Sequence, residues 1–219
     1  MSDTSIPFAT PSTVVTARTV PRSATAVAVA VRPTGSVPRS VGMSRRDLER
    51  HGFSGKVGQV VSIPRRDAAT VIAVGVGDRP SSADLRNAAA AAVRHAQHHT
   101  HFALDLLSSS SASAADARAV TEGALLAAYR YPGITAKPTT KPKFESLTIV
   151  TSGTAAVERG VREGKVRSRA TYLARDLANT PPAHLNARDL EGIVLGLAAD
   201  HGFDVEVFDE NDLAEMGCG

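Results

Sequence analysis

The sequence of 219 residues has a single cysteine, no tryptophan and only 4% aromatic residues. With Cys218 as its only thiol, the chain cannot form an internal disulfide, which fits a reducing compartment. So few aromatic side chains offer few platforms on which the bases of single-stranded nucleic acid could stack. The sequence also lacks the run of about 18 apolar residues that a membrane-spanning helix needs. The stretch Met1–Pro7 has neither the basic nor the apolar region of a secretory signal. We therefore expect a cytoplasmic protein without a membrane partner.

The charge balance is weakly basic. The 25 basic and 22 acidic residues leave a formal charge of +3 and a pI near 9.3. This excess is too small to predict nucleic-acid binding by itself, although it leaves that function open. At about 150 residues per domain, the length fits one complete domain and part of another.

Hydrophobic periodicity predicts strands that alternate with helices. The segments with period-two alternation or short apolar runs are 12–17, 25–31, 57–63, 70–76, 101–107, 147–150 and 204–208. The segments with helical spacing or capping residues are 43–51, 85–97, 114–131, 154–179, 187–201 and 211–216. This alternation predicts an α/β fold with a largely parallel or mixed sheet.

The helix predicted over 154–179 has two differing halves. An apolar stripe in its second half consists of Val166, Ala170, Leu173 and Leu177. Gly160 and Gly164 lie upstream, where the apolar side chains point to the opposite side. We therefore expect the helix to change its burial partner or bend near these glycines, as a helix between two domains would. The domain boundary is predicted at about 152–165.

Two segments suggest ligand chemistry, each with a structural alternative. The turn Gly75–Asp78 follows a strand and precedes a helix, where phosphates are often bound, but its glycines could simply relax a tight turn. His95, His98 and His99 have helical spacing, with His101 just beyond, and could present imidazoles to a metal. They could equally be solvated at the end of a helix, where a partial negative charge favours them.

Charged segments and the cysteine are weaker candidates. Basic residues occur along the long helix and in the loop 132–143. Those of the helix are Arg159, Arg162, Lys165, Arg167, Arg169 and Arg175, and those of the loop are Lys137, Lys141 and Lys143. The helical ones scatter around the helix, whereas a nucleic-acid footprint gathers on one face. An acidic cluster near the C-terminus comprises Asp204, Glu206, Asp209, Glu210, Asp212 and Glu215. It lacks the spacing that two-metal chemistry requires, and no base is placed to activate Cys218.

Three segments resemble the cytosolic leucyl aminopeptidase family. The segment 174–182, ARDLANTPP, looks like the ARDLxNTPP element at the entry to that family's catalytic domain. The segment 122–131, EGALLAAYRY, is similar to an element late in its N-terminal domain. The segment 205–217 looks like the strand and turn that precede the metal-binding core. In order and spacing these pieces cover about 70–219, and the first 60 residues resemble the family only in pattern.

The resemblance implies a domain organisation and a parent activity. It implies a flexible terminus over 1–11, a macrodomain-like N-terminal domain over 12–152 with a mixed sheet between helices, an interdomain helix over 153–180, and an incomplete first α/β unit of the catalytic domain over 181–219. In the family, two divalent ions, Mn or Zn, activate water for the removal of N-terminal amino acids. The resemblance places the catalytic and metal-binding residues beyond Gly219, so no catalytic, cofactor or metal site residue is expected in this chain. It also implies a homohexamer for the full-length parent.

Three functions remain open at this point. The first is an aminopeptidase fragment that serves assembly or regulation and is inactive alone. The second is a macrodomain-like module that binds a nucleotide or ADP-ribose at the turn after Val76. The third is a basic nucleic-acid-binding domain that uses the long helix and the loop 132–143.

Overall fold

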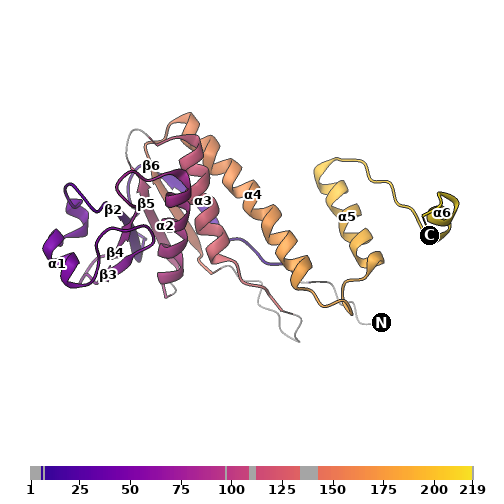
Figure 1. The fold of residues 1–219 in the computed structure, drawn as a ribbon, viewed down its shortest axis with the longest axis horizontal. Helices are drawn as coiled ribbons and strands as arrows, with labels where there is room; N and C mark the ends of the chain where they lie inside the picture. The colour runs from indigo at the N-terminus through magenta and orange to yellow at the C-terminus, as the bar shows by residue number, and fades with distance from the viewer. Residues whose placement is uncertain (1–5, 7, 97, 109–111, 134–142, 219) are drawn as a thin grey trace.

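The computed structural model describes residues 6, 8–96, 98–108, 112–133 and 143–218 (Figure 1). Its centre is a six-stranded sheet in the order β1-β6-β5-β2-β4-β3. The strands are β1 (Thr13–Ala17), β2 (Ala26–Val31), β3 (Val60–Ile63), β4 (Thr70–Gly75), β5 (His101–Leu107) and β6 (Ser146–Thr151). Only β3 is antiparallel to its neighbour; the other paired strands of the sheet run parallel.

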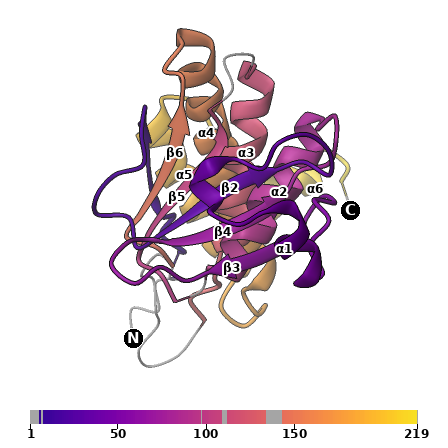
Figure 2. The same ribbon diagram turned by 90° about the vertical axis from the view of Figure 1, so that its left-hand side faces the viewer.

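Helices cover both faces of this sheet. The helices α2 (Ser82–His95), α3 (Ala114–Ala128) and α4 (Ala155–Asn179) share one face, and α2 and α4 both contact α3 (Figure 1). The 3-10 turn η1 (Arg39–Val41) and α1 (Arg45–Arg50) pack on the other face, against β2 and β4. Turned by 90°, the strands β2, β3 and β4 cross in front of α2 and α3 (Figure 2). The remaining helices, α5 (Ala187–His201) and α6 (Glu210–Glu215), lie beyond the end of α4.

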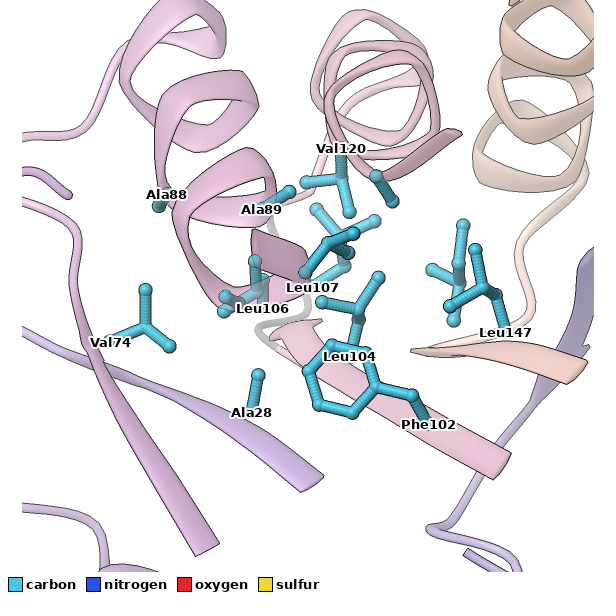
Figure 3. Packing of buried hydrophobic residues seen from close by; sticks show 14 of the residues in the cluster. Ala28, Val74, Ala88, Ala89, Phe102, Leu104, Leu106, Leu107, Val120 and Leu147 are labelled. Carbon is cyan, nitrogen blue, oxygen red and sulfur yellow. The ribbon is translucent and has the colours of Figure 1, made fainter. Parts of the chain in front are cut away.

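The larger apolar core lies between the sheet and α2, α3 and α4. Phe102 and Leu104 of β5 point into it together with Leu147 of β6, and Ala89 and Val120 meet them from the helices (Figure 3). All of these side chains are buried. Apolar burial of this kind stabilises the fold by about 25 cal/mol per Å² removed from water.

Side-chain caps fix where these helices begin. Ser81 and Ser113 each accept a hydrogen bond from the backbone N–H three residues later, and the carboxylates of Asp84 and Asp116 accept one in return from the serine N–H. These reciprocal bonds satisfy N–H groups that have no partner inside a helix. Both helices therefore start at the edge of the sheet where the parallel strands end.

Glycines let the three helices approach one another closely. A Cβ atom built on Gly123 would lie 2.2 Å from the backbone oxygen of Arg86, and one on Gly160 would lie 2.1 Å from that of Ala114. On Gly164 it would lie 2.7 Å from the Cβ atom of Thr121. No other residue type leaves this space free, so the glycines determine the spacing of α2, α3 and α4.

The helix α4 corrects one prediction from the sequence. Its glycines do not mark a change of burial partner, because Gly160 and Gly164 pack on α3 and Tyr172 and Asp176, further along, contact α3 as well. The predicted apolar stripe is not the buried face, since Val166 is 66% exposed. The buried face consists of Val157, Gly160, Val161, Gly164, Ser168, Tyr172 and Asp176, and its small residues allow the close contact between helices.

The other predicted elements are present with shifted ends, except for one strand. The segment 57–63 is a strand only from Val60, and the helix predicted over 114–131 ends at Ala128. The prediction of a strand over 204–208 is wrong: residues 203–209 form no strand, and most of their side chains are exposed. A strand needs a neighbour to pair with, and within the described residues this segment has none.

Candidate functional site

Two of the three segments that carry the family resemblance, 122–131 and 174–182, meet at one buried carboxylate. Asp176 of α4 is 1% exposed. The hydroxyl of Tyr129 donates to its Oδ1 at 2.8 Å, and the backbone N–H of Ala9 donates to its Oδ2 at 2.8 Å. A buried polar group needs such hydrogen-bond partners to offset the loss of water. Asp176 therefore joins the end of α3, the end of α4 and the N-terminal segment.

Aromatic and cationic contacts support this junction. The rings of Tyr129 and Tyr172 meet edge to face at 5.0 Å, and the hydroxyl of Tyr172 donates to the backbone oxygen of Leu125 at 2.6 Å. The guanidinium of Arg175 lies 5.1 Å from the centre of the Tyr129 ring and donates to the backbone oxygen of Leu126 at 3.0 Å. Burial, followed by the neighbouring Asp176, raises the pKa of Tyr129, so its hydroxyl keeps its proton and remains a donor.

The first residue of the EGALLAAYRY segment sits in a second polar cluster. The side chain of Glu122 is 8% exposed and accepts a hydrogen bond from Arg86 of α2. The Nε atoms of Arg118 and Arg167 lie 3.8 and 3.9 Å from its Oε1. Glu122 therefore bridges α2, α3 and α4 electrostatically, where Gly123 allows their close approach. The sequence alone did not reveal this cluster, because its residues come from three separate helices.

Next to the Asp176 junction is an apolar cleft of about 850 Å³. Its walls are Phe8 and Ala9 of the N-terminal segment, the apolar stripe of α4 that includes Leu173, and Ile193 and Leu197 of α5. The whole of α5 is described, and none of its residues is buried. The exposed apolar side of α4 thus faces an open cleft instead of a core.

The turn Gly75–Asp78 is shaped by backbone packing. A Cβ atom on Gly75 would lie 2.0 Å from the backbone oxygen of Lys56, and Gly77 has a φ of +80°, which glycine adopts readily. The N–H of Gly77 donates to the oxygen of Gly55, and that of Val76 donates to the oxygen of Val31. The alternative of a relaxed tight turn is therefore what the structure supports, and these N–H groups are not free for a phosphate.

The histidines predicted as a possible metal site do not converge on a common point. His95 Nε2 lies 2.8 Å from the hydroxyl of Ser62, and His101 Nδ1 lies 3.0 Å from that of Ser146. Partial burial, followed by the nearby His98, lowers the pKa of His99. Across the part of the chain that the structure describes, no three histidine, cysteine, aspartate or glutamate side chains are grouped so that they could hold a metal ion. The residues present therefore do not fit a two-metal centre.

The remaining candidates that the structure describes lie on the surface, whereas Lys137 and Lys141 lie outside the described residues. The acidic residues at 204–215 are exposed or belong to helix caps; hydrogen bonds to the backbone at Asp212 and Asn211 lower the pKa of Asp209. Cys218 is exposed. Two arginines of α4, Arg159 and Arg167, form ion pairs with glutamates on α3 and α4 and do not gather into a basic stripe. Among the described helices, none has both the length and the apolar character needed to cross a membrane.

The fold and these surfaces define an α/β domain of the open-sheet class that ends in a long helix with an uncovered apolar side. The model of the cytosol aminopeptidase family's N-terminal domain matches residues 39–138. A probable cytosol aminopeptidase of Streptomyces avermitilis is 35% identical over 197 residues, which cover 78% of this chain and 37% of the relative. One of Corynebacterium diphtheriae is 32% identical, covering 77% of this chain and 34% of the relative. This chain belongs to the cytosol aminopeptidase family and contains its N-terminal domain.

Solved structures agree with this assignment. The bottromycin maturation enzyme BotP in complex with Mn is 31% identical, with a TM-score of 0.74 over 89% of this chain and 40% of that enzyme. A mutant of tomato leucine aminopeptidase is 19% identical, with a TM-score of 0.75 over 95% of this chain and 47% of that protein, which supports the fold. Fold similarity thus includes most of the first 60 residues, where the sequence resembled the family only in pattern. The chain spans 34% to 38% of the lengths of the eight curated relatives compared with it.

Proposed function

We propose that this chain is the N-terminal part of a leucyl-type metalloaminopeptidase and that it serves assembly or regulation without catalysing peptide hydrolysis alone. The observation that carries the proposal is the junction at Asp176. Two of the three segments that resemble the family contact each other there, near the end of α4, and the N-terminal segment joins them. The junction fixes the direction of α4, and therefore of whatever follows it.

The proposed organisation keeps the domain boundaries expected from the sequence. Residues 12–152 form a macrodomain-like domain, 153–180 the interdomain helix and 181–219 the first part of a catalytic domain. The uncovered apolar side of α4 and the exposed α5 support this proposal, because apolar surface of this size normally contacts another part of a protein. The rest of a catalytic domain is the partner that we propose for it.

The full-length parent is proposed to be a cytoplasmic homohexamer that uses two divalent ions, Mn or Zn. The relatives are called cytosol aminopeptidases, which supports the cytoplasmic location. The BotP structure contains Mn, which supports the use of a divalent ion. Metal ions in such enzymes activate water and polarise the peptide carbonyl. The described residues of this chain do not fit the ions, so the proposal assigns them no catalytic role.

The test is a peptidase assay on the purified chain. With leucyl p-nitroanilide and added Mn²⁺ or Zn²⁺, we expect no release of nitroaniline above the buffer rate, while the full-length Streptomyces avermitilis relative serves as the positive control. Metal-dependent turnover by the chain would contradict the proposal that it is inactive alone. The assembly role is tested by deleting from that relative the segment matching 13–151; the deletion should prevent hexamer formation, as measured by analytical ultracentrifugation.

A further inference from the structure

A second cleft, of about 480 Å³, lies at the edge of the sheet where β2, β4 and β5 end. The strands β4 and β5 lie on opposite sides of β2 in the sheet. The chain forms β4 on one side of β2, passes through α2 and then forms β5 on the other side, so the direction of its path across the sheet reverses at β2. Open α/β sheets bind ligands outside the carboxyl ends of their strands at such a reversal. The volume is also within the range of about 300–1,000 Å³ that is typical of small-molecule sites.

The surroundings of this cleft disfavour a phosphate. The N–H groups of Val76 and Gly77 are already bonded to backbone oxygens. At the start of α3, the carboxylate of Asp116 accepts the N–H of Ser113 at 3.0 Å and the hydroxyl of Ser82 at 2.7 Å. The backbone N–H groups of Val76, Gly77 and Ser113 are therefore occupied, and a phosphate would meet the carboxylates of Asp78 and Asp116 beside the arginines of the cleft.

The charges on the cleft wall balance each other. Arg32 and Arg79 supply two positive charges, and Asp78 and Asp116 supply two negative ones. Since Asp116 is engaged in the helix cap, Asp78 is the carboxylate available to a ligand. The hydroxyl of Thr34 donates to Oδ1 of Asp78, and among the described residues the Oδ2 atom is the one left to accept a hydrogen bond from a ligand. A ligand of zero net charge with separated positive and negative groups matches this pattern better than a polyanion does.

Apolar residues also line the cleft. Val76, Leu85, Leu106 and Leu107 contribute to its wall, but all four are buried and the open surface of the cleft is mostly polar. Leu106 and Leu107 lie between the end of β5 and the helices (Figure 3). A ligand in this cleft therefore meets mainly polar and charged groups.

We propose that this cleft binds a zwitterion, namely a free amino acid or short peptide. Asp78 accepts the ligand's ammonium group, and Arg32 or Arg79 binds its carboxylate. The source of the ligand rests on the proposed function, because an aminopeptidase releases amino acids and shortened peptides, which are zwitterions at neutral pH. The site would then report product concentration to the domain that serves assembly or regulation.

The test is isothermal titration of the purified chain with L-leucyl-L-leucine. We expect saturable binding with a Kd of about 1 mM or lower. The analogue acetylated at its amino group and the analogue amidated at its carboxyl group should each bind at least about tenfold more weakly, because each loses one charge-assisted hydrogen bond. Inorganic phosphate and ADP-ribose should bind more weakly than the dipeptide.

Substitutions locate the binding. Asp78→Asn and Arg79→Gln should each weaken dipeptide binding about tenfold without changing thermal unfolding, since both side chains are exposed. Asp67→Asn and Arg66→Gln are the matched controls: they are also exposed, follow β3 before β4 begins, and do not line the cleft. Absence of saturation at ten times the expected Kd, equal binding of the blocked analogues, or tighter binding of ADP-ribose or phosphate would each overturn the proposal. The titration requires no catalysis, so a failure to bind the dipeptide would not contradict the proposed aminopeptidase function. Conversely, peptidase turnover by the chain would not contradict dipeptide binding at this cleft.

Discussion

Replacing Gly123 or Gly160 by alanine should destabilise the domain, although alanine is the better helix former. In an open helix the exchange gains about 1 kcal/mol. Here the added Cβ would lie 2.2 Å from the oxygen of Arg86, or 2.1 Å from that of Ala114, and both oxygens belong to the backbone of a neighbouring helix. Neither can rotate away, so α3 must separate from its neighbour and lose apolar contact along its length.

Overpacking of this kind costs about 1–3 kcal/mol or more, which exceeds the gain in helix propensity. We expect a net loss of about 1–2 kcal/mol for each variant in urea unfolding, and a melting temperature lower by about 2–8 °C. The matched control is Gly192→Ala in α5, where a Cβ atom would meet nothing within 4 Å. This variant should be as stable as the native chain or more stable.

The prediction is tested by comparing the unfolding free energies of the three variants with that of the native chain. If Gly123→Ala and Gly160→Ala were as stable as the native chain, the close packing of α2, α3 and α4 described above would be wrong. If Gly192→Ala were destabilised to the same degree, the loss would be a general effect of the substitution and would say nothing about helix spacing. Circular dichroism of all three variants, with native-like spectra before unfolding, excludes misfolding as the cause.

Three further outcomes are expected. Tyr129→Phe removes a donor from buried Asp176 and should cost about 1–3 kcal/mol in urea unfolding; no loss would show that the junction does not depend on this bond. Glu122→Gln should lower the free energy of unfolding by about 1–3 kcal/mol, because it removes the charge shared by three arginines. The control Glu163→Gln, at a side chain that is 42% exposed, should lower it by less than about 1 kcal/mol. Equal losses would contradict the bridging role of Glu122. Burial acts to raise the pKa of Asp116, but hydrogen bonds from serines at two helix starts outweigh it and hold the pKa below the usual 3.8. Its contribution to stability is therefore complete above about pH 4 and is lost as the pH falls through the lowered value, and Asp116→Asn should flatten that part of a stability curve measured from pH 6 to pH 2; an unchanged curve would refute this.

The sequence predicted the sheet well because its strands carry strong local signals. The alternating valines of 25–31 and the apolar run at 70–76 correspond to β2 and β4, which pair with each other inside the sheet. The same kind of alternation at 204–208 led to a wrong prediction of a strand. A side-chain pattern indicates which face could be buried, but it does not indicate whether a neighbouring strand exists. Pairing is a property of the whole fold.

The buried face of α4 could not be predicted from hydrophobicity. Val166 lies on the uncovered side, whereas Gly160, Gly164 and Ser168 are buried together with Val157, Val161 and Tyr172. Close helix packing selects small residues, so apolar character alone does not mark the buried face here. The contact between Tyr129 and Asp176 was equally hidden, since 47 residues separate them in sequence. Only the resemblance marked both segments, and it did not show that they touch.

The position of β1 has a consequence for synthesis of the chain. Thr13 pairs with Ser146, so β1, which is translated before the other strands of this sheet, has no partner until more than a hundred further residues have been translated. Contacts of such long range form slowly and after local ones. Helices α2 and α3 can form and pack early, whereas β1 must remain unpaired until β6 arrives. The final step in completing this sheet is therefore the joining of its earliest and latest strands.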